Sequence, residues 1–271
     1  MLFRSIIFSA LAVSIVAGLV LTFIQFFFVN PIIFEAESFE QNTSTLVLDI
    51  VQSSSEHEHG SNQATDHHNP ANVQEKESDY HTHDTEAWGP KDGVERSLFS
   101  ALTNIITAFG FSALMLAFMT QLQSMGKTKL NAVKGLLWGG AGFIAFFAAP
   151  GLGLSPEIPG TQAADLLLRQ IWWTLTVVAT CLALSILVFT PFKYKLIGVL
   201  ILVLPFIIGA PHIDGPEFIH PDPQAVQNLI ALHHQFIINS AVANLLFWLV
   251  MGLGGGLMVN RFILKNKTTN S

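Results

Sequence analysis

Long apolar stretches alternate with short polar ones along most of the chain, and this pattern predicts helices that cross a membrane. A spanning helix needs about 20 mostly apolar residues. The candidates are residues 5–28, 98–121, 133–152, 171–190, 196–210 and 236–259. The pattern therefore predicts an all-α integral membrane protein, in which residues 1–271 form a single polytopic domain built as a bundle of about six transmembrane helices.

The fifth stretch, residues 196–210, is a weak span. As a helix it rises only about 22 Å, against a hydrocarbon core of about 30 Å. A crossing would need a thinned bilayer, or help from Lys193 and Lys195, whose long side chains can reach the interface. A re-entrant hairpin is the alternative, and the sequence leaves both open.

Local signals mark where helices end and how they pack. Asn30-Pro31 is expected to end the first helix and Pro191 the fourth, because proline cannot continue the helical hydrogen-bond ladder. The apolar run after Arg4 exceeds the roughly 7–15 residues of a signal peptide, which favours an uncleaved first span. Small residues spaced by four would let two helix backbones approach closely; they are Gly135, Gly139, Ala141, Ala145, Ala149, Gly252 and Gly256.

The longest polar stretch, residues 41–87, follows the first span and is expected to be an external, disordered loop because it is polar and poor in aromatic residues. Its histidines, all within residues 53–84, are His57, His59, His67, His68, His81 and His83. Neutral imidazole binds Co²⁺, Ni²⁺, Zn²⁺ and their neighbours. A disordered loop holds no fixed geometry, so it would bind metal weakly and exchange it quickly, as a collector does. The alternative is a solvated linker without a metal role.

Charge is scarce and unevenly placed. Charged residues make up 12% of the chain, against about 25% in soluble proteins. If the N-terminus is inside and all six stretches cross, nine of the 13 Lys and Arg residues lie inside, and all 19 acidic residues and ten histidines lie outside. By the positive-inside rule, this predicts a multi-pass protein of the cell inner (cytoplasmic) membrane, with cytoplasmic termini and a periplasmic or extracellular histidine-rich loop.

Carboxylate and imidazole groups gather at the predicted outer ends of the spans, where a ring of such groups concentrates cations. Besides the loop histidines, the residues expected to bind metal there are Glu35, Glu37, Glu40, Glu157 and His212. A possible metal pathway adds Asp92, Glu95, Asp165, His220, His233 and His234 at the rim, and Gln25, Asn104 and Asn244 inside the spans.

A structural role is the alternative for several of these residues. Acidic residues in the first turn of a helix stabilise its dipole, which fits Asp92, Glu95 and Asp165. Arg96 and Arg169 could then pair with them. Amides inside spans often hydrogen-bond between helices rather than line a path.

Several function classes are disfavoured. The segment Met125–Thr128, MGKT, ends like a phosphate-binding loop but lacks the earlier glycine and a preceding strand. The sequence has no HExxH motif, and its single cysteine, Cys181, allows no intramolecular disulfide or thiolate cluster. The chain is therefore expected to be no enzyme, to hold no tightly bound cofactor and to bind no nucleic acid. A membrane-embedded metalloenzyme is kept only as a distant rival.

Several segments together resemble one known family. They are LFRSIIFSALAVSIVAGLVLT, PIIFEAESFE, WGPKDGVERSLF, GLLWGGAGFIAFFAAPGLGLSPEIPG, RQIWWTLTVVAT, LPFIIGAPH and NLLFWLVMGLGGG. The chain is similar over nearly its whole length, the histidine-rich insert excepted, to the CbtA family of predicted cobalt transporter subunits. The resemblance implies a polytopic membrane protein linked to cobalt uptake, with a small single-span companion, CbtB. The resemblance implies a role in transport only for the acidic residues in the matching motifs, which are Glu35, Glu37, Glu40, Asp92, Glu95, Glu157 and Asp165.

The expected function is uptake of a divalent transition metal, Co²⁺ foremost, across the cytoplasmic membrane, with the histidine-rich loop collecting the ion. Ni²⁺ or Zn²⁺ transport by the same machinery is the near alternative, because the ligand types suit all three metals. A membrane subunit that binds or senses metal without transporting it is the alternative from another class. The expected partners are the lipid bilayer, the metal ion and the CbtB-like companion.

Overall fold

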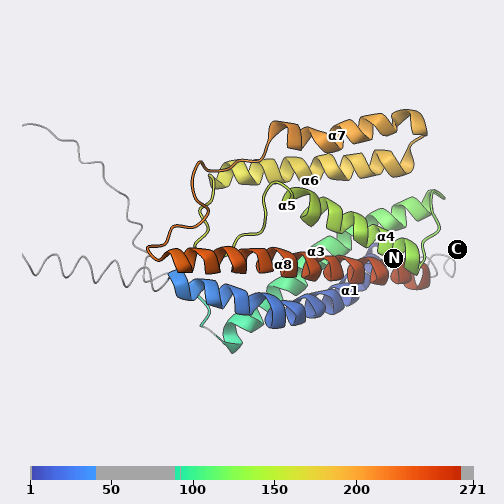
Figure 1. The fold of residues 1–271 in the computed structure, drawn as a ribbon. Helices are drawn as coiled ribbons and strands as arrows, with labels where there is room; N and C mark the ends of the chain where they lie inside the picture. Colours follow the sequence, from blue (N-terminus) through green and yellow to red (C-terminus); the bar gives the residue numbers. More distant parts are fainter. Residues whose placement is uncertain (1, 41–88, 92, 264–271) are drawn as a thin grey trace, which may run out of the picture.

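The computed structural model describes residues 2–40, 89–91 and 93–263, and these residues form a bundle of helices that run alternately in opposite directions (Figure 1). The main helices are α1 (Leu2–Ile24), α3 (Val94–Ser124), α4 (Ala132–Phe143), α6 (Leu166–Phe189), α7 (Lys195–Ile208) and α8 (Pro223–Met258). In the described part, five helical stretches are long and apolar enough to cross a membrane, namely Leu2–Glu40, Val94–Ser124, Ala132–Gly151, Leu166–Phe189 and Pro223–Arg261. The predicted all-α bundle of about six helices is confirmed. The predicted loop 41–87 lies outside the described residues.

The first helix does not end at Asn30-Pro31, so that prediction is wrong. A π-helical turn, η1 (Gln25–Val29), precedes the proline, and the chain stays helical through Glu40. Pro31 has no N–H, and its ring would clash with a carbonyl one turn back in a regular helix. The wider turn relieves this, and the Phe28 carbonyl accepts a hydrogen bond of 2.7 Å from the Asn239 amide of α8. This hydrogen bond joins α8 to the first helix at the π-helical turn.

The third helical stretch also has a π-helical turn just before a proline. The π-helical turn η3 (Ile144–Ala148) follows α4 and leads into the short α5 (Ala149–Gly151), which contains Pro150. By contrast, α6 ends at Phe189, before Pro191, as predicted. The remaining turns are η4 (Phe192–Tyr194), a 3₁₀ turn, and η5 (Val259–Ile263), a π-helical turn at the end of α8.

Glycines bring α4 and α8 into backbone contact. A Cβ atom on Gly139 would overlap the Trp248 carbonyl oxygen, and one on Gly135 would overlap the Gly252 carbonyl oxygen. A Cβ on Gly256 would lie 2.6 Å from the Asn131 carbonyl oxygen. The prediction that these glycines allow close packing is confirmed, and the reason is that only hydrogen fits between the two helices.

The hairpin of α6 and α7 lies beside the other helices (Figure 1). The Trp172 indole N–H of α6 donates a hydrogen bond of 3.1 Å to the Pro205 carbonyl of α7. α7 has 14 residues and rises about 21 Å, less than the roughly 30 Å of a hydrocarbon core. It ends at Gly209, whose φ of 86° suits glycine. Residues 209–222 then run outside regular helix to the start of α8.

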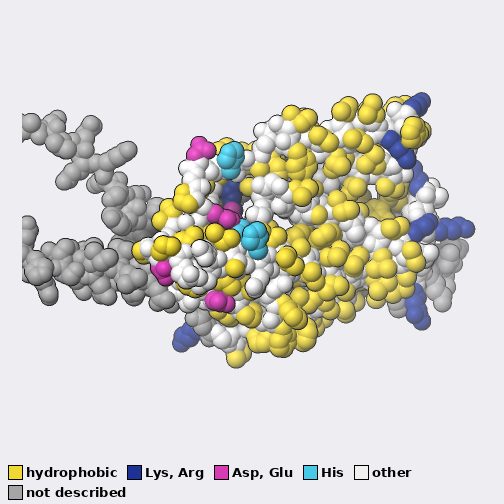
Figure 2. Space-filling model, in the orientation of Figure 1, with side chains coloured by type: hydrophobic (Ala, Val, Ile, Leu, Met, Phe, Trp, Pro, Cys, Tyr) yellow, Lys and Arg dark blue, Asp and Glu magenta, His cyan; other side chains and the backbone are white. Residues whose placement is uncertain are grey.

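Charged side chains separate to the two ends of the bundle. α1 begins and α8 ends at the same end, where most of the visible Lys and Arg side chains lie (Figures 1 and 2). We call this the basic end. Asp, Glu and His side chains gather at the opposite end, which we call the acidic end, and hydrophobic side chains cover the surface between (Figure 2). The separation of basic from acidic and histidine residues that the sequence indicated is therefore also seen in the folded molecule.

Candidate functional site

The acidic end is held together by a small apolar cluster, which we call the rim cluster. It joins the helical residues 30–40, the loop 152–165, the loop 209–222 and the first turns of α8. Its buried members are Ile32, Ala36, Ile158, Phe218, Leu229 and Leu232. The two loops also meet through their backbones, because Gln162 N–H donates a hydrogen bond of 2.8 Å to the Glu217 carbonyl. Burial of this cluster therefore fixes the loops that carry the polar side chains of the site.

Glu37 forms an ion pair with Arg96, the third residue of α3. The guanidinium donates two hydrogen bonds to the carboxylate, of 2.7 and 3.2 Å, and lies 4.8 Å from the centre of the Phe34 ring. Both side chains are about one-third exposed, at 33% for Arg96 and 29% for Glu37. The two hydrogen bonds and the contact with the Phe34 ring together fix the orientation of the Arg96 guanidinium.

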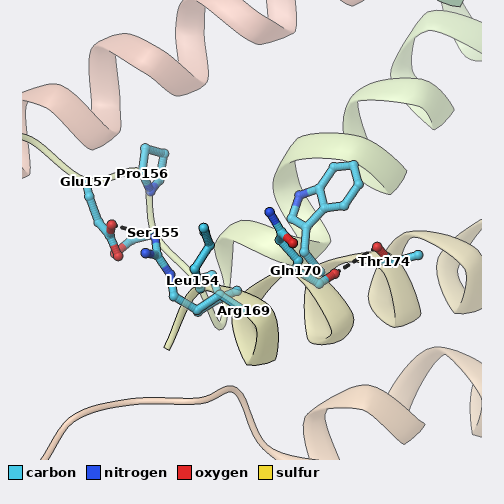
Figure 3. Close-up of a pocket in the computed structure, with 9 residues that line it drawn as sticks. Leu154, Ser155, Pro156, Glu157, Arg169, Gln170 and Thr174 are labelled. Atoms are coloured by element: carbon cyan, nitrogen blue, oxygen red, sulfur yellow. Dashed lines mark hydrogen bonds and ion pairs between the residues drawn. The ribbon is translucent and has the colours of Figure 1, made fainter. Parts of the chain in front are cut away.

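Glu157 pairs with Arg169 of α6, at 2.5 Å between a carboxylate oxygen and a guanidinium nitrogen. The pair lies at one end of an open pocket of about 520 Å³ between the loop 152–165 and α6 (Figure 3). Gln170, Trp173 and Thr174 line the pocket further along the helix. The pocket therefore combines a charged mouth with an aromatic and hydroxyl-bearing wall, a surface that can hold water or a hydrated ion.

Glu217 meets His233, a residue of α8 that is 5% exposed. The His233 Nδ1 atom lies 2.5 Å from the Glu217 carboxylate, and its Nε2 atom lies 2.8 Å from the Pro156 carbonyl oxygen. The Phe218 ring packs edge-on against the imidazole at 5.9 Å between centroids. His233 thus ties the loop 209–222 and the loop 152–165 to α8, and Pro156 is the residue before Glu157.

The three contacts repeat one arrangement, and we call them the rim pairs. Three pairs of consecutive helices have their connecting ends at the acidic end, namely α1 and α3, α4 and α6, and α7 and α8. In each case a glutamate that precedes the second helix in sequence pairs with a basic residue of that helix. The pairs are Glu37–Arg96, Glu157–Arg169 and Glu217–His233.

The other predicted rim residues are spread around this end. Asp165 caps α6, accepting a 3.1 Å hydrogen bond from Leu168 N–H, and Glu95 lies in the first turn of α3. Both fit the structural alternative. Arg96 and Arg169 have the glutamate partners just described. The exposed residues at this end include Glu35, Glu40, His212 and His234.

His220 lies on the loop 209–222 and is partly buried. Its Nδ1 atom accepts a 3.0 Å hydrogen bond from Asp222 N–H, and its ring lies 6.4 Å from that of Phe39. Its Nε2 atom is buried without a hydrogen-bond partner. His212, by comparison, has Nδ1 3.2 Å from the Ala210 carbonyl oxygen and an exposed ring.

Of the amides inside the spans, Asn104 connects two helices and Asn244 bonds within its own helix. Asn104 of α3 donates hydrogen bonds of 2.6 Å to Gln25 and 3.0 Å to Thr22, and so joins α3 to the first helix. Asn244 donates to the Ser240 carbonyl one turn back in its own helix, at 2.9 Å. The Asn104–Gln25 contact is a hydrogen bond between helices, as the alternative interpretation predicted, whereas the Asn244 contact is not.

The comparisons with known proteins place the chain in a family. A family model described as "Probable cobalt transporter subunit (CbtA)" matches residues 3–260. The chain is a member of the CbtA family. No curated protein and no solved structure matches it. The match confirms the resemblance seen in the sequence, and a transporter family implies a role other than catalysis.

Several predicted metal ligands of this CbtA protein lie outside the described residues. They are the six loop histidines; Asp92, predicted for the metal pathway, also lies outside them. Within residues 2–40, 89–91 and 93–263, no group of three or more His, Cys, Asp or Glu side chains is close enough to hold a metal ion. The ring of ligands expected at the rim is therefore present there as pairs rather than as a preformed cage.

Glu217 belongs to the acidic groups expected at the rim, but it was not among the residues predicted to bind metal or to form a pathway. A signal was available, because the two loops share a pattern: Ala149-Pro150 precedes Pro156-Glu157-Ile158, and Ala210-Pro211 precedes Pro216-Glu217-Phe218. In both loops the residue after the glutamate is buried in the rim cluster. Comparison of the two loops would have placed Glu217 beside Glu157 as an equivalent position in this CbtA chain.

The MGKT segment has a structural explanation. It forms the end of α3, where Gly126 adopts a φ of 73°. Gly126 N–H donates to the Gln123 carbonyl at 3.0 Å, and Lys127 N–H donates to the Leu122 carbonyl at 3.1 Å. This is a helix C-terminal cap rather than a phosphate-binding loop.

Proposed function

We propose that this CbtA protein moves Co²⁺ inward across the cytoplasmic membrane. The observation that carries the proposal is the bundle with an acidic, histidine-bearing end and a basic end, in a chain whose family is that of a cobalt transporter subunit. A surface rich in carboxylate and imidazole attracts divalent cations, whereas a basic end repels them. Cations would therefore concentrate at one side of the membrane.

The acidic end faces outward in this proposal. Cytoplasmic loops are enriched in Lys and Arg, and the basic end carries Arg4, the α3–α4 turn, the α6–α7 turn and Arg261. Both termini are then cytoplasmic, and the histidine-rich loop, residues 41–87, is periplasmic or extracellular. That loop collects the ion, and a small single-span CbtB-like protein is the expected companion.

The ion passes from the loop to the rim, where Glu35, Glu37, Glu40, Glu157 and His212 receive it. The membrane potential supplies energy for the passage without ATP. One charge crossing 100 mV gains about 2.3 kcal/mol, so a divalent ion gains about 4.6 kcal/mol. This sustains an inward accumulation of about three orders of magnitude.

Whole-cell metal content tests the proposal. Cells that lack other cobalt uptake would receive trace Co, Ni and Zn and would express the intact chain, the chain without residues 53–84, or neither, each with and without the companion. Mass spectrometry should show a selective rise in Co with the intact chain. The shortened chain should give a smaller rise at low Co supply and an equal rise at high supply, because a collector matters only when metal is scarce.

The other outcomes separate the alternatives. A rise in Ni or Zn in place of Co would assign the same machinery to another metal. No rise in any metal, even with the companion present, would show that inward transport is wrong. Metal bound to purified chain without accumulation in cells would then support a binding or sensing subunit.

A further inference from the structure

The rim pair Glu217–His233 differs from the other two in the chemistry of its basic partner. Arg96 and Arg169 present only N–H donors and have no lone pair for a metal. Imidazole and carboxylate are both ligands for divalent transition metals. Among the rim pairs, Glu217–His233 therefore has two members that can bind a metal at the same time.

The surroundings of His233 orient its ring as in a metal site. The Pro156 carbonyl only accepts hydrogen bonds, so Nε2 carries a proton and donates to it at 2.8 Å. Nδ1 is then the nitrogen directed at the Glu217 carboxylate, at 2.5 Å. In proteins a metal-bound histidine almost always donates its other ring N–H to a carbonyl or carboxylate, which fixes the tautomer and the ring plane. Burial against Phe218 holds the ring further.

We propose that Glu217 and His233 form the first fixed binding site for the transported divalent metal, with Pro156 as the outer hydrogen-bond acceptor. The inference rests on the proposed function, since it names a site for the cargo of that function. Without metal, the Nδ1 atom and the carboxylate face one another and share a proton. A divalent ion takes the place of that proton between the same two atoms, and the proton leaves to solvent.

The two proposed ligands differ in solvent exposure, and this difference indicates the side from which the ion enters. The His233 side chain is 7% exposed, whereas the Glu217 side chain is 46% exposed and lies on the loop 209–222. Metal–ligand bonds of about 2.0–2.2 Å require these two atoms to move apart. Glu217 moves and His233 stays, so the ion enters from the solvent side of the carboxylate. Water fills the remaining coordination positions, and two protein ligands hold the ion weakly enough to release it.

The test uses purified full-length chain in which the six loop histidines are replaced by asparagine, so that loop binding does not mask the site. Equilibrium dialysis against radioactive Co²⁺ should show one saturable site per chain. His233→Asn and Glu217→Gln should each weaken Co²⁺ binding at least tenfold, and Gln227→Ala, an exposed change on the same helix, should leave it unchanged. X-ray absorption at the Co edge should show one imidazole nitrogen among oxygen ligands.

His233→Arg separates metal binding from loop anchoring. Arginine forms the kind of ion pair found in the other two rim pairs, so the thermal stability should be retained in this variant while Co²⁺ binding is lost. Parent-like Co²⁺ binding by His233→Arg, or by both His233→Asn and Glu217→Gln, would overturn the site. Absence of saturable binding in the loop-substituted parent would overturn it as well.

Cell accumulation distinguishes this inference from the proposed function. Co accumulation that is unaffected by His233→Asn and Glu217→Gln would overturn the site and leave transport standing. Saturable, His233-dependent binding in a chain that accumulates no metal in cells would leave a metal site standing and overturn transport.

Discussion

The α4–α8 interface and the α6–α7 hairpin are both built from apolar helices but are held together in different ways. In the first, Gly135, Gly139 and Gly252 bring two backbones into contact. In the second, the Trp172 indole and aliphatic side chains join the helices, and most of the large apolar side chains of α7 are exposed. Apolar composition places a helix in the membrane, whereas residue size decides how closely it binds its neighbour.

Among the changes that test this difference in packing, Gly139→Ala is expected to destabilise the protein most. The added methyl group would overlap the Trp248 carbonyl, which is backbone and cannot rotate away. We expect a loss of about 3 kcal/mol in the free energy of unfolding. Thermal unfolding of the purified protein in detergent measures it. Gly140→Ala is the matched control, because a Cβ there meets nothing within 4 Å, and equal destabilisation by both changes would contradict the backbone-contact interpretation.

A second change removes a polar contact of α8 rather than a steric one. Asn239→Ala leaves the Phe28 carbonyl, displaced by the π-helical turn, without its side-chain donor. The expected loss is about 2 kcal/mol, the range for an unsatisfied polar group in an apolar setting. Asn244→Ala, whose amide bonds only within its own turn of helix, should cost less in the same unfolding assay. The reverse order would show that the π-helical turn needs no external donor.

Trp172→Phe is expected to weaken the contact between α6 and α7. It keeps an aromatic ring near Gly153 but removes the N–H that reaches the Pro205 carbonyl. That carbonyl still accepts from Gly209 N–H, so the expected loss is about 1 kcal/mol. Chemical denaturation would reveal it as a lower midpoint with unchanged helix content. A loss as large as that of Gly139→Ala would mean that the two regions are equally tightly held.

The smallest effect is expected for Gly198→Ala on α7. The added methyl would lie 3.1 Å from Leu187 Cγ and 3.2 Å from Ile186 Cγ2, both in side chains that can shift, and 3.3 Å from the Ala183 carbonyl oxygen, against 2.3 Å for the carbonyl contact at Gly139. Alanine is favoured over glycine within a helix by about 1 kcal/mol, which offsets the crowding. The unfolding temperature should therefore stay nearly unchanged. A drop comparable to that of Gly139→Ala would refute the contrast in packing.

Local patterns in the sequence predicted much of the fold. The spacing of Gly135, Gly139, Gly252 and Gly256 indicated close packing, and the structure shows it between α4 and α8. The hydrophobic stretches located the helices but not their ends, because the length of an apolar run reports bilayer thickness rather than helix length. α8 begins at Pro223, well before residue 236, and therefore contains His233 within the helix rather than before it.

The features that escaped prediction depend on neighbours distant in sequence. Pro31 looked like a helix stop because no local pattern shows that a π-helical turn lets the helix continue past it. Glu37 and Arg96 are 59 residues apart, so no helical or turn spacing relates them. The same holds for Pro156 and His233, which are 77 residues apart. The candidate site was thus predictable as a set of residue types at one end, but not as pairs.

The π-helical turn at Gln25–Val29 also sets the rotational phase of the first helix. A π turn contains one residue more than an α turn, and each residue of an α-helix rotates the chain by about 100°. Everything beyond the turn is therefore rotated relative to a straight continuation of α1. This rotation places Ile32 and Ala36 in the rim cluster and Glu37 beside Arg96. Deletion of one residue from the turn would leave the residues before the turn in register and turn residues 30–40 away from the site.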